Sequence, residues 1–441
     1  THLLNGHNAI AIFPTGSGKS LCYQLPALHL DGLTLVISPL IALMKDQIDA
    51  LRKRGIAAAR YDSSLSEEER QEVLQGIKGR TLKLLYIAPE RLSNERFTAQ
   101  ISGQKISLLA IDEAHCISAW GHNFRPEYLK LENASQKLQV ERTLALTATA
   151  TPQVVGDMAR VFHVQKEHIV HTGFYRPNLN LKVVTFMGQQ RDEHLLQQLG
   201  KKENTPAIVY VTLQKTAEKV AAFLNEHHLS AEHYHAGMSD EDRVRVQDDF
   251  MQSENGIVVA TIAFGMGVDK SNIRSIYHYN MAKGFESYMQ EIGRAGRDGE
   301  TATCELFQSS ADRTVLENFT YGDTPDPTAV EQCIDELLSN EHEIDISTNE
   351  LSRRYDIRNL VISTLLTHLE LEGVVESLGA YYGQIQFKPL RSSQEILSGL
   401  QPQQQQFLKT LFSCATKAKI WFTLDTGKAI RKLKVNREKI L

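Results

Sequence analysis

The chain has 441 residues, of which 42% are apolar and 23% are charged, and its formal net charge is -5. At roughly 100–200 residues per domain, this length predicts two to four domains and excludes a single small module. The balanced composition excludes a wholly disordered or fibrous chain. The net charge gives no global electrostatic case for a polyanionic partner, so any contact with nucleic acid must be local.

No stretch approaches the roughly 18 consecutive apolar residues that cross a bilayer, and the N-terminal segment lacks the layout of a secretory signal. We therefore expect no membrane partner. The five cysteines lie far apart without a CxxC pair, which favours a reducing compartment: the cytoplasm, with nucleoid association, if the protein is bacterial, or the nucleus if it is eukaryotic. Because the chain opens on Thr1 close to an expected strand, we expect that residues have been removed upstream.

Short apolar runs alternate with helical patterns over residues 1–172, which is typical of a parallel sheet with helices on both faces. The first domain is therefore predicted to be α/β. Its expected strands are Asn8–Phe13, Thr34–Ile37, Lys83–Ile87, Leu108–Ile111 and Thr143–Leu146.

A less periodic, Pro-containing stretch, His171–Pro177, interrupts the pattern, which then resumes and predicts a second α/β domain over residues 173–321. Its expected strands are Leu181–Phe186, Ala207–Val211, Glu232–Tyr234, Gly256–Ala260 and Ser275–Tyr279.

The run GDTPDPT at Gly322–Thr328 predicts the next boundary. Within the domain expected at residues 322–391, the segment Ser347–Phe387 follows the order helix, helix, hairpin. An S-x-x-E capping box at Ser347 opens the first of these helices, and the two helices are expected to meet near Asp356. Val374–Glu376 and Ile385–Phe387 read as the two strands of the hairpin. This order favours a winged helix preceded by an acidic helical connector, and the alternative is a helical packing module.

Charge is uneven toward the C-terminus. Leu316–Asp345 holds nine acidic residues without Lys or Arg, and Lys409–Leu441 holds nine Lys and Arg against two acids. We expect residues 392–441 to form a basic helical segment that is truncated.

The sequence PTGSGKS at Pro14–Ser20 follows an expected strand and precedes a helical pattern, as a phosphate-binding loop requires. Its glycines allow successive N–H groups to point inward, Lys19 can reach the β and γ phosphates, and the Ser20 hydroxyl can coordinate Mg²⁺. Phe13 stands where the strict motif has its first glycine, and a glycine-rich turn without ligand is the alternative. The predicted nucleotide-binding residues are Thr15, Gly16, Ser17, Gly18, Lys19 and Ser20.

Two adjacent carboxylates end the strand Leu108–Ile111 in the sequence IDEAH. The carboxyl ends of parallel strands face the ligand crevice, so Asp112 can hold Mg²⁺ and Glu113 can activate the attacking water. For the sequence DEAH taken alone, the alternative is a solvated helix start. Together with the phosphate loop, they predict an ATPase pair.

These motifs belong to an ordered set. It consists of PTGSGKS, SPLIALMKDQ (Ser38–Gln47), APERL (Ala88–Leu92), DEAH, TATA (Thr147–Ala150), FGMGVDK (Phe264–Lys270) and QEIGRAGRDG (Gln290–Gly299). The set resembles superfamily 2 helicases, and AIDEAHCISAWGHNFRPEY at Ala110–Tyr128 resembles more narrowly the RecQ family of DNA helicases. The resemblance implies two tandem RecA-like domains that close on ATP and Mg²⁺, single-stranded and forked duplex DNA as partners, and 3′ to 5′ unwinding.

Arg294 and Arg297 lie three positions apart, with Gln290 one turn earlier. On one helix face they would project together toward a phosphate held by the first domain, where an arginine stabilises charge on the transferring phosphoryl group. A surface salt-bridge pair is the alternative. The resemblance adds Gly267 and Asp269 of FGMGVDK to the nucleotide site.

Stacking faces and polar groups are concentrated after the DEAH motif, as a contact to single-stranded DNA needs. The residues are Trp120, His122, Phe124 and Arg125. In the RecQ family this loop couples DNA to hydrolysis; a packed aromatic loop is the ordinary alternative. Further candidates for contact with the DNA backbone are Ser38, Lys45, Thr212 and Lys215.

Two features of the RecQ family are missing from the sequence. Only Cys304 and Cys333 lie where the family carries four zinc-binding cysteines, so we predict no structural zinc. The glutamine motif that recognises adenine would fall before Thr1. The expected preference for ATP over GTP therefore rests on the resemblance alone.

The sequence thus favours an ATP-dependent DNA helicase of RecQ type. An RNA helicase of the same superfamily stays open, because sequence does not show contacts to the 2′-OH. An ATP-gated scaffold that anneals or binds nucleic acid without processive unwinding also stays open.

Overall fold

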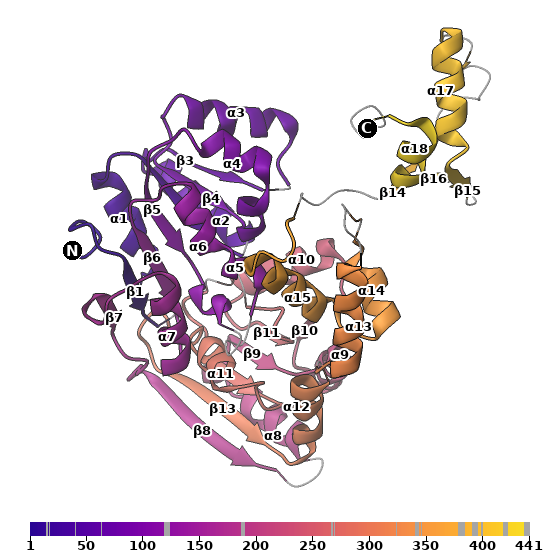
Figure 1. Cartoon of the computed structure of the whole chain (residues 1–441). Helices are drawn as coiled ribbons and strands as arrows, with labels where there is room; N and C mark the ends of the chain where they lie inside the picture. The colour runs from indigo at the N-terminus through magenta and orange to yellow at the C-terminus, as the bar shows by residue number, and fades with distance from the viewer. Residues whose placement is uncertain are drawn as a thin grey trace. The chain divides into compact units, whose positions relative to one another are not determined.

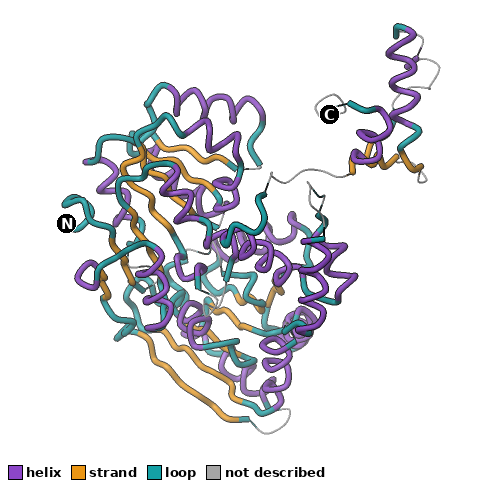
Figure 2. Tube along the Cα trace, viewed as in Figure 1, coloured by secondary structure: helices purple, strands orange, loops and turns teal. Residues whose placement is uncertain are grey.

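The computed structural model describes residues 1–14, 16, 18–39, 41–62, 64–118, 124–186, 190–265, 268, 270–322, 324–339, 344, 346–377, 384–389, 396–397, 400–417 and 422–435. The chain forms two compact units, Thr1–Val375 and Glu376–Leu441 (Figure 1). Helices and strands alternate through most of the first unit (Figure 2). None of its described helices, nor any in the second unit, is long and apolar enough to cross a membrane.

A seven-stranded parallel sheet, in the order β3-β4-β2-β5-β6-β1-β7, organises the first domain. All five strands expected here are confirmed. The strands β3 and β7 were not predicted from the sequence, because they are short edge strands. The strands are β1 (Ala9–Ile12), β2 (Leu33–Ile37), β3 (Ala58–Tyr61), β4 (Leu84–Ile87), β5 (Ile106–Ile111), β6 (Thr143–Thr147) and β7 (Ile169–His171).

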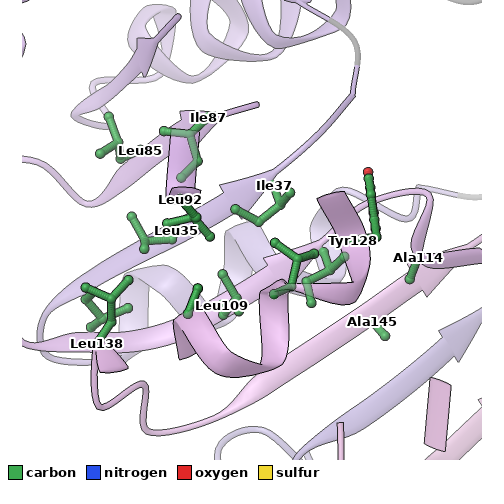
Figure 3. Close-up of a cluster of buried hydrophobic side chains, with 14 of the residues drawn as sticks. Leu35, Ile37, Leu85, Ile87, Leu92, Leu109, Ala114, Tyr128, Leu138 and Ala145 are labelled. Carbon is green, nitrogen blue, oxygen red and sulfur yellow. The ribbon is translucent and has the colours of Figure 1, made fainter. Parts of the chain in front are cut away.

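Successive residues of these strands point to opposite faces, and both faces are buried. On β1, Ile10 and Ile12 enter one apolar cluster while Ala9 and Ala11 enter the other. Figure 3 shows the first of these clusters, where Leu35, Ile37, Leu109 and Tyr128 lie among side chains of neighbouring strands and helices. The covering helices are α1 (Leu21–His29), α2 (Ile41–Lys53), α3 (Glu67–Lys78), α4 (Glu95–Ile101), α5 (Pro126–Leu129), α6 (Leu131–Lys137) and α7 (Pro152–Val161), with a 3₁₀ turn, η2 (Ala114–Ile117).

The second domain repeats this architecture with a six-stranded parallel sheet, in the order β10-β11-β9-β12-β13-β8. The five expected strands are confirmed, and β13 is additional. The elements are β8 (Leu179–Thr185), α8 (Arg191–Leu199), β9 (Ala207–Tyr210), α9 (Gln214–Glu226), β10 (Ala231–Tyr234), α10 (Asp240–Gln252), β11 (Ile257–Ala260), β12 (Ser275–His278), α11 (Phe285–Ile292), β13 (Ala302–Gln308) and α12 (Ala311–Tyr321). The two tandem RecA-like α/β domains expected from the sequence are therefore present.

Three helices complete the first unit, and we call α13 (Pro327–Leu338), α14 (Thr348–Tyr355) and α15 (Asn359–Leu371) the helical module. Their shared core includes Cys333 and Ile362, both fully buried. The two predicted helices are confirmed: Ser347 accepts a hydrogen bond from the N–H of Glu350 at 3.4 Å, and Asp356 ends α14 with a left-handed φ of 53°. Helix α15 packs against α5 of the first domain, where Lys130 forms an ion pair with Glu370.

The predicted hairpin of residues 322–391 is wrong. Val374–Glu376 forms no strand, and the other expected strand, β14 (Gln384–Phe387), pairs antiparallel with β16 (Phe422–Asp425) in the second unit. Among the described residues, the two expected helices are thus present, but the local hairpin that would make them a winged helix is not. The tail at 392–441 is also not purely helical, because β15 (Ala415–Lys417) and β16 accompany α17 (Pro402–Phe412) and α18 (Thr426–Leu433).

Candidate active site

The phosphate-binding loop connects β1 to α1. Gly16 and Gly18 adopt positive φ angles of 82° and 78°, which side chains other than glycine rarely tolerate. The chain then enters α1 through a hydrogen bond from the N–H of Leu21 to the carbonyl of Gly18 at 2.9 Å. The loop therefore has the left-handed turns and the following helix N-terminus that suit an anion. Thr15 and Ser17 lie outside the described residues.

The two carboxylates stand at the carboxyl end of β5, in the middle of the first sheet. The N–H of Asp112 donates to the carbonyl of Ile37 on neighbouring β2 at 2.8 Å. Burial, reinforced by the charge of Glu113, raises the pKa of Asp112 to about 6, and the ammonium group of Lys19 acts in the opposite sense. Asp112 is thus a desolvated carboxylate close to the phosphate-loop lysine, as predicted for a residue that meets a cation.

Glu113 has a left-handed backbone conformation, with φ 49° and ψ 42°. For a residue with a Cβ this conformation costs about 1–2 kcal/mol. The strain accompanies the turn that carries the chain from β5 into η2, and the N–H of Glu113 donates to Asp112 Oδ1 at 3.0 Å. Strain held at such a position is common in active sites.

His115 links the DEAH motif to the TATA motif. Its Nδ1 lies 2.9 Å from Thr147 Oγ1 and 3.3 Å from Glu113 Oε2. Thr147 Oγ1 in turn donates to the carbonyl of Thr149 at 2.8 Å, and the carbonyl of Thr147 accepts from the N–H of Phe13 at 3.2 Å. Burial lowers the pKa of His115, but hydrogen bonds to Cys116 and Glu113 outweigh it and raise the pKa to about 10.

Arg297 brings the second domain to the phosphate loop. A Cβ placed on Gly16 would lie 3.3 Å from Arg297 Cγ and 3.4 Å from its Cδ. The Nη1 group of Arg297 also donates to the carbonyl of Val268 at 3.2 Å. One arginine of the predicted pair is therefore placed at the loop that would hold the phosphates.

Arg294 is placed differently, and the expectation of a shared helix face is wrong. Helix α11 ends at Ile292, so both arginines follow it in a turn-rich segment. Arg294 is 7% exposed and donates to the carbonyl of Gly265 in its own domain. Gln290 lies on α11 and is partly buried, whereas Gly267 and Asp269 lie outside the described residues.

A cavity of about 10 Å³ lies beside the phosphate loop, lined by Ser20, Ser38, Gln47, Tyr86 and Asp112 among others. Such a volume has room for about one water molecule. Ser38 is 3% exposed, and within the described residues its hydroxyl has no hydrogen-bond partner. Ser38, a candidate for contact with the DNA backbone, thus has a buried side chain that lines this cavity.

The remaining candidates for DNA contact are only partly located. Lys45 on α2 and Lys215 on α9 are exposed, and Phe124 and Arg125 are half-buried. Trp120 and His122 lie outside the residues that the structure describes. The N–H of Thr212 is held by Asn280 Oδ1 at 3.2 Å.

The sequence analysis did not identify a polar network that holds the backbone at Thr212. Arg191 forms a buried bidentate pair with Asp312, with N–O distances of 3.1 and 3.0 Å. Asp312 Oδ1 also accepts from Asn280 Nδ2 at 2.9 Å, and Asn280 holds Thr212. No local motif marks these residues, because their partners lie 32 to 121 positions away. The pairing of the buried Arg191 with the buried Asp312 is therefore apparent only from the three-dimensional structure.

The DEAD/DEAH box helicase family matches residues 1–158, and the helicase conserved C-terminal domain matches residues 190–299. The chain is 47% identical over 306 residues to the ATP-dependent DNA helicase RecQ of Bacillus subtilis, covering 69% of this chain and 51% of that protein. It is 36% identical over 373 residues to the probable ATP-dependent DNA helicase RecS of the same organism, covering 84% and 75%.

Among solved structures, the chain resembles the DUF1998 helicase MrfA bound to DNA, with a TM-score of 0.58 and 17% identity over 86% of this chain and 56% of that one. At this identity the likeness concerns the fold alone. The chain spans about half the length of the first RecQ-type relatives, at 51%, 42% and 50%. Both conserved domains, their motifs and these relatives agree: the chain belongs to the RecQ family of DEAD/DEAH box helicases.

Proposed function

We propose that this protein is an ATP-dependent DNA helicase whose two RecA-like domains close on ATP and move 3′ to 5′ along one strand. The observation that carries the proposal is the contact of Arg297, from the second domain, with Gly16 in the phosphate loop of the first. Only a nucleotide at this seam would touch both domains at once. The names of the relatives, all DNA helicases, support DNA as the partner.

The residues at this seam fit ATP and Mg²⁺. Gly16 and Gly18 have the backbone conformations of a phosphate cradle, and Asp112 is a half-buried carboxylate whose raised pKa marks an unfavourable charge that a cation would relieve. Lys19 and Ser20 would hold the phosphates and the ion, with Asp112 beyond them. When bound, Mg²⁺ neutralises charge on the phosphate oxygens.

The remaining steps belong to the protein's own side chains. Glu113 is the base that accepts a proton from the attacking water, and His115 and Thr147 fix its surroundings through the contacts at 3.3 and 2.9 Å. Arg297 compensates the charge that develops on the transferred phosphoryl group. Because Arg297 comes from the second domain, hydrolysis requires the domains to be closed.

Single-stranded and forked duplex DNA are the proposed substrates. Separating one base-pair step costs roughly 1.4 kcal/mol of stacking on average, so sustained unwinding requires an external source of free energy. The exposed side chains of Lys45 and Lys215 lie one in each domain and suit two phosphates of the same strand. Phe124 and Arg125, directly before α5, suit a contact that reports the DNA to the DEAH motif.

The test is the ATPase rate of the full chain with single-stranded DNA, with single-stranded RNA and without nucleic acid, combined with strand displacement on a fork. The parent should be stimulated by DNA and should displace the strand. Lys19→Ala should abolish turnover, and Trp120→Ala should mainly lose the stimulation. Equal stimulation by RNA would favour an RNA helicase, and ATP-dependent binding without strand displacement would favour an annealing scaffold; either result would overturn the proposal.

A further inference from the structure

The segment that carries both arginines is held by the chain that joins the two sheets. We call residues 293–299 the arginine loop; it follows α11 and contains Arg294 and Arg297. The linker between β7 and β8 contains Arg176 and Asn178. These two residues lie more than 110 positions before the loop, yet their side chains bond to its backbone.

Arg176 donates to three carbonyl groups of the arginine loop. Its Nη1 lies 3.4 Å from the carbonyl oxygen of Gly293, and its Nη2 lies 2.9 Å from that of Ala295 and 2.6 Å from that of Gly296. A planar guanidinium group can serve several acceptors in a fixed fork, which a lysine ammonium group does not reproduce. Arg176 therefore fixes the path of the backbone from Gly293 to Gly296, directly before Arg297.

Asn178 completes this clamp. Its Nδ2 donates to the carbonyls of Gly296 and Glu300, both at 2.8 Å, and its Oδ1 accepts from Arg176 Nε at 3.3 Å. Gly296 has a positive φ of 52°, and a Cβ there would lie 2.6 Å from Asn178 Nδ2. The loop is thus closely fitted around the asparagine one residue before Arg297.

We propose that Arg176 and Asn178 are positioning residues for Arg297: they hold the backbone from which Arg297 reaches the phosphate loop. This inference rests on the proposed function, since it assigns how that function's arginine is placed. Within the described residues, the side chains of Arg176 and Asn178 form hydrogen bonds with the arginine loop, with the adjoining Glu300 carbonyl and with each other, so both act through the arginine loop. Because the linker leaves the first sheet at β7, the clamp also attaches the arginine loop to the segment that joins the two domains.

The expected effect is on turnover rather than on ATP binding. A misplacement of about 1 Å at a reacting centre can cost about 100-fold in rate. ATP affinity should be preserved, because the phosphate loop and Asp112 belong to the first domain. Arg176→Ala should therefore lower DNA-stimulated kcat by about 10- to 100-fold with little change in KM for ATP, and Arg176→Lys should not restore it.

The decisive experiment is a double-mutant cycle on the full chain with Arg176→Ala, Arg297→Ala and both together, measured as kcat and KM for ATP. The double variant should be no slower than Arg297→Ala, because a clamp has no further effect once its arginine is gone. The inference would be overturned if the losses in kcat of the two single variants multiplied in the double variant. A raised KM for ATP or full activity of Arg176→Ala would also overturn it. Failure of Arg297→Ala to lower kcat would instead count against the proposed function.

Two further variants separate positioning from general damage. Arg245→Ala removes an exposed arginine of α10 paired with Glu232 and Asp249 and should leave kcat unchanged. If Arg176→Ala lowers the melting temperature strongly, Asn178→Ala provides the same cycle with two carbonyl contacts removed. A multiplicative loss in that second cycle would equally contradict the clamp.

Discussion

The side chain of Arg297 lies against Gly16: a methyl group on that glycine would stand 3.3 Å from Arg297 Cγ. The two residues belong to different RecA-like domains, and the sequence places them 281 positions apart. Since Gly16 is within the phosphate loop, the contact lies at the seam where the proposed function couples hydrolysis to domain closure.

The two arginines of the arginine loop should respond differently to truncation. Arg297→Ala should lower DNA-stimulated kcat by about 10³-fold while the melting temperature stays unchanged, because the side chain acts on developing charge. Arg294→Ala should lower the melting temperature, because it removes a buried group bonded to the Gly265 carbonyl. Steady-state kinetics and thermal unfolding of both variants check this, and equal behaviour of the pair would contradict it.

Affinity for Mg²⁺-nucleotide should depend on pH through Asp112. With a pKa of about 6, this carboxyl group is increasingly protonated below pH 6, and a divalent cation binds the ionised form. Affinity should therefore be flat above pH 7 and fall toward about tenfold per unit below pH 6. The nucleotide itself titrates in the same way with the parent and with Asp112→Asn. The ratio of the dissociation constants of these two proteins therefore reports the contribution of Asp112 alone. A ratio that does not change with pH would show that Asp112 is not the titrating group.

Thr147 should couple hydrolysis to unwinding. Thr147→Val keeps the side-chain volume but removes the hydroxyl that contacts His115 at 2.9 Å and the Thr149 carbonyl at 2.8 Å. We expect strand displacement to fall about tenfold more than ATPase activity, in line with the loss of one or two buried hydrogen bonds. Thr149→Val is the matched control, since that hydroxyl has no partner within the described chain; similar losses in both variants would refute the link.

The Arg191–Asp312 pair should dominate the stability of the second domain. Both side chains are less than 10% exposed, and removal of one partner from a buried pair costs about 3–5 kcal/mol. Asp312→Ala should lower the free energy of unfolding by that amount in a denaturant titration. Asp240→Ala, whose side chain is 89% exposed in its pair with Arg243, should change it by less than about 1 kcal/mol.

Purified protein should contain no stoichiometric zinc. The prediction follows from the two cysteines, Cys304 and Cys333, in the interval where the family has four. Elemental analysis after gel filtration measures it directly. One zinc per chain would show that ligands of another kind assemble the site.

Local patterns were sufficient for much of the fold and for the ATPase motifs. Strand β1, the loop after it and Asp112 at the end of β5 all follow from apolar runs with defined ends. The prediction of a wing was wrong because β14 pairs with β16, about 40 positions away, and not with the neighbouring segment Val374–Glu376. The clamp by Arg176 was invisible because backbone carbonyls accept its hydrogen bonds, and any residue has a carbonyl.

The ion pair between Lys130 and Glu370 joins α15 to the first domain, whereas the helical module follows the second domain along the chain. Lys130 directly follows α5, and α5 directly follows the segment expected to touch DNA. Any rotation that parts the two sheets must break this pair or drag α15 with it. The helical module is thus tied to the first domain by side-chain contact and to the second domain by the chain itself.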